Sequence, residues 1–201
     1  MTYHLLVAAH VVAAVCLGIA IASVCLANGR ARRAGDLTTF LRARRHTTLV
    51  EQRLLRPAVL ALLVSGTWLV AQFYGASSLL AQPWLAGMVL LFVFQSAWAG
   101  VVVHAHARRL EQLAGEARLA GALTPALDQA RRAPLARLGD VVEPLVYLLI
   151  MALGAARPFT WTPVLAGIAA VALGSAALAA LWRYVPASAF NRASVDAAGR
   201  T

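Results

Sequence analysis

The first apolar run of the chain limits its fold more than any other feature. Residues 3–27 read YHLLVAAHVVAAVCLGIAIASVCLA and contain no Asp, Glu, Lys or Arg. At roughly 1.5 Å per helical residue, about 25 residues span the hydrocarbon core of a bilayer, which is about 30 Å thick. The basic residues follow this run, whereas in a secretory signal peptide they precede it. We therefore expect an uncleaved transmembrane helix.

Composition extends this expectation to the whole chain. Hydrophobic residues make up 61% of the 201 residues and charged residues 13%, whereas a soluble domain carries roughly 25% charged residues. We predict an all-α polytopic membrane bundle, with one transmembrane domain over residues 1–185 and a polar cytoplasmic tail at 186–201. Its five transmembrane helices are expected at about 3–27, 57–74, 84–105, 141–157 and 162–183.

The distribution of Arg predicts the orientation. All 18 basic residues are Arg, and most of them lie within 30–56 and 107–140. Basic connecting segments face the cytoplasm, so we expect the N-terminus outside and the C-terminus in the cytoplasm, in a bacterial cytoplasmic (inner) membrane. The same rule accounts for the formal net charge of +10. The expected partner is therefore the lipid bilayer and not nucleic acid.

Turn and capping residues predict the ends of several helices. Asn28-Gly29 is a plausible helix stop after the first span, and Asp36 is a good N-cap for an amphipathic helix lying at the membrane interface. Thr124-Pro125 has the composition of an N-cap followed by the first helical residue. Both basic segments are thus expected to be loops with short helices.

The ionisable residues near the cytoplasmic boundary allow two interpretations. Asp140 and Glu143 have the spacing of a capping box at the start of the fourth span, which makes Glu143 a helix-start residue. Alternatively, Glu143 joins a cytoplasm-side cluster with His104 or His106. The two histidines are two positions apart, about 200° around a helix, so they cannot chelate one metal ion from a regular helix.

His10 is the main candidate for a functional site. It lies in the outer half of the first span, where an imidazole needs a partner on another helix. Arg157 ends the fourth span on the same side of the membrane. A pocket between these helices suits haem b or a related redox ligand, with His10 on the iron, Arg157 on a propionate and Trp68 in the wall.

A simpler interpretation of the same residues stays open. His10 bonds to a Ser, a Thr or a backbone carbonyl of a neighbouring helix, and Arg157 reaches the outer lipid headgroups. Both interpretations use the residues that the sequence places on the outer side of the membrane.

These residues carry a family resemblance. The segment LLVAAHVVAAVCLG around His10, the mid-span Ser65-Gly66 and the helix end at Arg157-Pro158 resemble the domain-of-unknown-function 2269 family of bacterial integral membrane proteins, over residues 3–158. That family is similar in outline to the HemJ-type protoporphyrinogen oxidases and to the CopD-type copper-resistance membrane domain. The resemblance implies a haem-linked histidine at His10 and the basic-Pro helix end at Arg157-Pro158.

Two functional hypotheses follow. In the first, the protein carries a haem-binding pocket on His10 and takes part in electron transport. In the second, it is a non-catalytic accessory or assembly subunit of a larger membrane (respiratory) complex, or a homo-oligomer. The fifth span favours such packing through a stripe of small residues, namely Gly167, Ala170, Gly174 and Ala177. The sequence assigns no reaction to the chain.

Overall fold

The computed structural model describes residues 2–184, and this part of the chain is helical with no strands. Five helical segments are long and apolar enough to cross a membrane, namely Thr2–Arg33, Leu37–Tyr74, Pro83–Ala120, Arg137–Ala156 and Trp161–Leu181. The predicted all-α bundle with five transmembrane helices is therefore confirmed. The predicted tail at 186–201 lies outside the described residues.

The first two spans are made of α1 and a long compound helix. Helix α1 covers Thr2–Arg33. The compound helix consists of α2 (Leu37–Val50), the π-helical turn η1 (Glu51–Leu55), α3 (Arg56–Leu69) and the π-helical turn η2 (Val70–Tyr74).

The remaining spans follow after a short helix, α4 (Ala76–Ala81). A second compound helix consists of α5 (Pro83–Trp98), the π-helical turn η3 (Ala99–Val103) and α6 (His104–Ala120). The last three helices are α7 (Pro125–Arg131), α8 (Pro134–Ala156) and α9 (Trp161–Tyr184).

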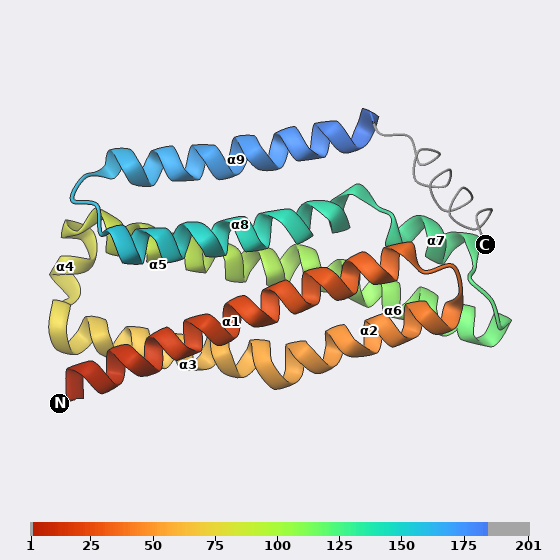
Figure 1. Cartoon of the computed structure of the whole chain (residues 1–201), viewed down its shortest axis with the longest axis horizontal. Coiled ribbons are helices and arrows are strands. Elements are labelled where there is room, and N and C mark those ends of the chain that lie inside the picture. The colour runs from red at the N-terminus through yellow and green to blue at the C-terminus, as the bar shows by residue number, and fades with distance from the viewer. Residues whose placement is uncertain (1, 185–201) are drawn as a thin grey trace, which may run out of the picture.

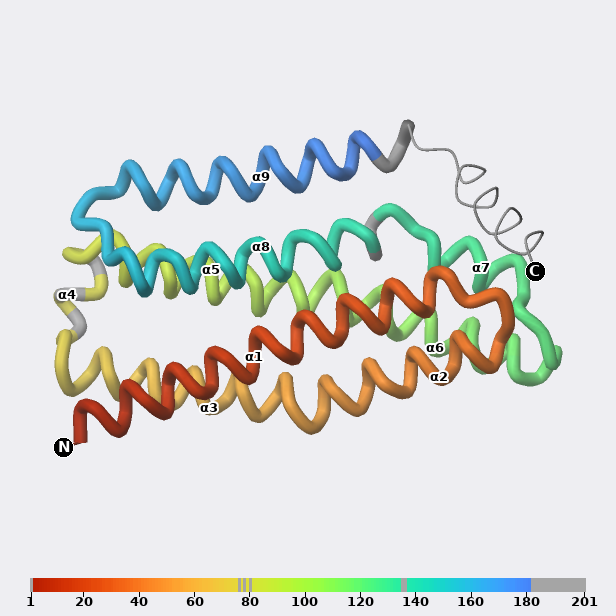
Figure 2. The backbone as a smooth tube through the Cα atoms, viewed as in Figure 1, coloured from red at the N-terminus to blue at the C-terminus, as the bar shows by residue number. Residues whose placement is uncertain are grey.

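The long helices run side by side, and the bundle has two different ends (Figure 1). Helix α1 packs along α2 and α3, while α8 packs between α5 and α9, which forms one edge of the bundle. We call the end with α4 and the α8–α9 connection the apolar end. The end with the α1–α2 connection and α7 is the basic end. Figure 2 shows the chain running back and forth between these ends, once for each of the five apolar helical segments.

The basic end differs from the expected loops. Helix α1 continues through Asn28-Gly29 to Arg33, so the predicted helix stop is wrong. The two compound helices each run unbroken for 38 residues, about 57 Å at roughly 1.5 Å per residue, which exceeds the membrane core of about 30 Å. The predicted interfacial helix is instead a continuous extension of the second span. The helices therefore project well beyond the hydrocarbon.

These projecting segments form a helical cap with its own core. We call the C-terminal turns of α1 together with α2, α6 and α7 the basic cap. Phe40 and Leu127 are completely buried in it. The other buried core residues of the cap are Ala31, Ala34, Ala43, Leu110, Ala114, Ala117 and Ala130. Small alanines allow the four helices to approach closely, and the Arg-rich faces are left outside.

Two predicted N-cap residues and one buried arginine stabilise the helices of the basic cap. The Asp36 carboxylate accepts a hydrogen bond from the Thr39 amide at 2.7 Å, and Thr124 Oγ1 accepts one from the Leu127 amide at 3.3 Å. Asp36 and Thr124 are therefore confirmed as helix N-cap residues. Arg131, only 4% exposed, donates from Nη1 to the carbonyls of Ala31, Arg32 and Ala34. It satisfies carbonyls that the end of α1 leaves without helical partners.

Close contacts at glycine join the spans within the membrane. Tyr147 of α8 donates a hydrogen bond to the Ala14 carbonyl of α1 at 2.9 Å. A Cβ atom at Gly18 would lie 2.5 Å from the Tyr147 hydroxyl oxygen, so this crossing requires glycine. On the other side, Gly167 of α9 packs on Leu149, while a Cβ at Gly174 would meet nothing within 4 Å. The small-residue stripe is therefore only partly used within one chain.

Replacing Gly18 by Ala tests the α1–α8 crossing. The added methyl group displaces the Tyr147 ring, and overpacking of this kind lowers the free energy of unfolding by about 1–3 kcal/mol. Thermal unfolding in detergent measures the effect. Gly29→Ala is the matched control on the same helix, because a Cβ there would meet nothing within 4 Å. Equal loss of stability in both variants would contradict the proposed crossing.

Asp128 in the basic cap gives a second prediction, in the pH dependence of stability. Burial alone would raise the pKa of the Asp128 carboxyl, but the hydrogen bonds and charges of Arg131 and Arg132 outweigh burial and lower it. A lowered pKa stabilises the folded protein above the ordinary pKa of 3.8, and this contribution is lost as the pH falls through the lowered value. Asp128→Asn should therefore flatten the stability curve between roughly pH 5 and pH 3.

Thermal unfolding across this pH range measures the slope. The exposed Glu116 on α6 provides the control variant Glu116→Gln. A slope that is the same in Asp128→Asn and in the unmodified protein would show that the Asp128 pairs do not contribute to folding.

Candidate functional site

His10 on α1 is held by a serine on α3. Its Nδ1 lies 2.9 Å from Ser65 Oγ, and Ser65 Oγ donates its proton to the Ala61 carbonyl at 2.6 Å. A serine hydroxyl has a single proton, so Ser65 accepts the bond from His10 Nδ1–H. The other ring nitrogen, Nε2, then carries the lone pair. The neutral imidazole is thus fixed in the tautomer whose Nε2 is free to bind a ligand.

The residue after Ser65 lets the ring approach. A Cβ atom at Gly66 would lie 3.2 Å from His10 Cε1, tighter than an ordinary contact. Ser65 and Gly66 therefore both belong to the contact between α3 and α1 at His10. This contact is the one that the simpler interpretation of His10 predicts. It is also the kind of second hydrogen bond that orients a metal-ligating histidine.

The other two predicted site residues make their own contacts or are exposed. Arg157 is the C-cap of α8, with a φ of 46°, and its guanidinium lies 5.5 Å from the centre of the Trp84 ring on α5. Trp68 is 54% exposed. Within residues 2–184, the hydrogen bond of His10 goes to Ser65, and Arg157 contacts Trp84 and the Gly154 carbonyl. Figure 1 shows α1 and α8 separating toward the apolar end.

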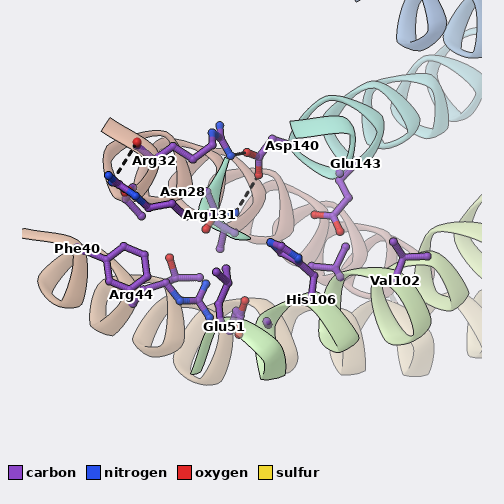
Figure 3. A pocket seen from close by; sticks show the side chains of 17 residues that line it. Asn28, Arg32, Phe40, Arg44, Glu51, Val102, His106, Arg131, Asp140 and Glu143 are labelled. Carbon is purple, nitrogen blue, oxygen red and sulfur yellow. Dashed lines mark hydrogen bonds and ion pairs between the residues drawn. The ribbon is translucent and has the colours of Figure 1, made fainter. Parts of the chain in front are cut away.

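A second group of polar side chains surrounds a cavity next to the basic cap. The cavity has a volume of about 60 Å³. Figure 3 shows polar side chains entering it from six elements. These side chains are Asn28 and Arg32 of α1, Arg44 of α2, Glu51 of η1, His106 of α6, Arg131 of α7, and Asp140 and Glu143 of α8.

Asp140 ties α8 to α1 at this cavity. It forms an ion pair with Arg32, and its Oδ1 accepts a hydrogen bond from Asn28 Nδ2 at 2.9 Å. The predicted capping box is therefore wrong. Helix α8 begins at Pro134 with Ala133 at the N-cap, so Asp140 already lies inside the helix. Its carboxylate partners come from α1, which no local sequence pattern reveals.

Pro144 frees backbone polar groups for contacts with other helices. Proline has no N–H, so the carbonyl four residues earlier loses its helical partner. That carbonyl belongs to Asp140, and Cys25 Sγ donates to it at 3.5 Å. Separately, the Glu143 carbonyl accepts a hydrogen bond from Gln95 Nε2 of α5 at 3.3 Å. Helix α8 is thus tied to α1 through the carbonyl that Pro144 frees, and to α5 through the Gln95 side chain.

Three ionisable side chains on the cavity have no such partners. Glu51, His106 and Glu143 make no side-chain hydrogen bond or ion pair within the described part of the chain. The Nε2 atom of His106 is fully buried and unpaired. His104 instead is exposed, with Nδ1 3.3 Å from the Ala99 carbonyl. The cytoplasm-side cluster thus contains His106 and Glu143 but not His104.

The sequence analysis missed Glu51 as a member of this cluster. Glu51 was assigned to a basic loop, whereas it lies on a continuous helix one turn before the apolar part of the second span. The described residues contain no group of three or more His, Cys, Asp or Glu side chains able to hold a metal ion.

Comparison with known proteins places the chain in a family. The family model described as a predicted integral membrane protein (DUF2269) matches residues 4–158. The chain belongs to this family. The DUF2269 match includes His10, Ser65 and all the polar cavity residues, and it ends between α8 and α9. No curated protein and no solved structure matches the chain. DUF2269 membership establishes an integral membrane protein and assigns no activity.

Proposed function

We propose that the protein binds haem b, or a related redox ligand, through His10 in the outer leaflet of a bacterial inner membrane. The observation that carries this proposal is the His10–Ser65 hydrogen bond of 2.9 Å. It holds the imidazole in the tautomer with a free Nε2. The bound group would supply reversible one-electron chemistry, and the protein would act in electron transport.

The available donors suit haem better than a simple metal ion. A metal ion held by protein side chains needs three or four of them, and no such group exists among the described residues. Haem brings four nitrogens of its own and takes an axial histidine from the protein. Around His10 the small Ala14 and the buried Leu17 provide apolar surroundings on α1.

Arg157 and Trp68 stay predictions within this proposal. Arg157 already interacts with Trp84 and with the Gly154 carbonyl at 3.4 Å, so pairing with a propionate requires it to leave the Trp84 ring. Trp68 would form part of the wall only if its exposed ring faces the ligand and not lipid. The proposal therefore depends on His10 and Ser65, with Arg157 as a separate test.

The third prediction is a haem spectrum that depends on His10. The full chain, expressed with haem precursor and purified in detergent, should show a Soret band and reduced α and β bands. His10→Ala should abolish them. Ser65→Ala should weaken haem binding by roughly 10–100-fold, because the axial histidine loses the bond that orients it. His104→Ala is the control, since His104 is an exposed histidine on a different helix, α6.

A colourless protein from haem-replete cells, or a spectrum unchanged in His10→Ala, would overturn the haem proposal. In that outcome, co-purification with a defined membrane complex would support the accessory-subunit hypothesis. Arg157→Gln separates the two parts of the proposal. Loss of haem in this variant would assign Arg157 to a propionate, and an unchanged spectrum would leave it as a contact of Trp84.

A further inference from the structure

Two kinds of charged side chain line the cavity next to the basic cap. The arginines already have ion-pair partners, whereas two of the glutamates have none. Arg32 pairs with Asp140, and Arg131 pairs with Asp128 while it also caps α1. Arg44 lies 3.9 Å from Glu111 outside the cavity. The carboxylates of Glu51 and Glu143 have no cation of their own. Two unpaired carboxylates on one small cavity repel each other, and taking up a proton relieves this repulsion.

His106 adds a proton acceptor to the same space. Figure 3 shows its imidazole and the Glu143 carboxylate pointing into the cavity from α6 and α8, and Glu51 lines the same cavity from η1. The His106 Nε2 atom is fully buried without a hydrogen-bond partner. A buried polar atom of this kind is normally satisfied by protein or by ordered water. Water bound in the cavity is therefore placed to form a hydrogen bond with this atom.

The size and donor set of the cavity limit what it can bind. About 60 Å³ holds a few water molecules and is too small for an organic ligand. The described residues offer no three-ligand group for a metal ion. Water molecules between carboxylates and an imidazole transfer protons, and ionisable residues within membrane proteins commonly mark such relays. A proton with its associated water is thus the ligand that fits.

We propose that Glu143, His106 and Glu51 form a proton-binding site that exchanges with the cytoplasm through the basic end. A proton from water on that side reaches the Glu143 carboxylate through the half-buried Glu51 and His106, and the neutral carboxyl then holds it. This proposal is independent of haem binding at His10.

Other charged and titratable groups face Glu143 and set the conditions of the test. They are Cys25 and Arg32 of α1, Arg44 of α2, Glu51 of η1, His106 of α6, Arg131 of α7 and Asp140 of α8. Asp140 and Glu51 are the acidic groups that act on Glu143 by charge. Because Asp140 also pairs with Arg32, Glu51 is the neighbour that can be neutralised without breaking the ion pair between α1 and α8. A variant at Glu51 should therefore change how Glu143 titrates.

The fourth prediction is an infrared signal of a protonated carboxyl group. The full chain in detergent, titrated in water and in deuterium oxide, should show a carboxyl band that appears as the pH falls. Glu143→Gln should remove the component of this band that appears first as the pH falls, while the components of the other carboxyl groups remain. Glu51→Gln should move the midpoint of that first component toward lower pH by on the order of one unit, because a negative neighbour is gone. Glu116→Gln, at an exposed position of α6, should leave band and midpoint unchanged.

Two results would overturn the proposal. The first is that the component appearing first as the pH falls persists in Glu143→Gln, and the second is that its midpoint does not respond to Glu51→Gln. Either result would mean that the cavity holds structural water only. If Glu143→Gln fails to fold, Glu143→Asp retains a carboxyl group one methylene shorter. That variant should keep the band with a shifted midpoint, and an unshifted midpoint would count against the site.

Discussion

The structure depends on a difference between two lengths. The hydrocarbon core of a bilayer is about 30 Å thick, whereas the two compound helices reach about 57 Å at roughly 1.5 Å per residue. The apolar parts of these helices are confined to the membrane, so all the surplus length projects from one side. The Arg-rich faces, the cap core and the polar cavity all belong to this surplus or to its border with the membrane. The sidedness of the protein follows from this arrangement.

The same border explains why polar groups gather around α8. Pro144 removes one backbone hydrogen bond just where α8 enters the apolar region, and the freed carbonyl of Asp140 finds Cys25. Asp140 is then close enough to pair with Arg32. Glu143, one turn further in, faces the cavity without a cation. The same helix therefore carries a carboxylate paired with α1 and, three residues later, one without a cation.

The sequence was sufficient for features that depend on neighbouring residues. Apolar runs predicted the five spans, because hydropathy responds to the membrane directly. The N-caps at Asp36 and Thr124 were predictable because each side chain bonds to an amide three residues on. The mid-span Ser65-Gly66 was one of the motifs that carried the family resemblance. Its contact with His10 matches one of the two interpretations drawn from the sequence.

Features that depend on distant residues were not predictable in this way. Asn28 looked like a helix stop, but in the fold its amide binds Asp140 and α1 continues. The capping-box pattern at Asp140 was wrong for the same reason, since its partners lie more than 100 residues away. The alanine-rich cap was interpreted as polar loops, because alanine contributes little to hydropathy and yet allows close packing. Pairings between helices decided each of these cases.

The position of α9 has a topological consequence. The family match covers α1 to α8 and ends at residue 158, after four crossings of the membrane. An even number of crossings returns a chain to the side from which it started, so the matched unit begins and ends at the apolar end. Helix α9 adds a fifth crossing and packs against α5 and α8 only at the edge of the bundle. With this single peripheral helix the number of membrane crossings becomes odd, so α9 ends on the same side as the basic cap.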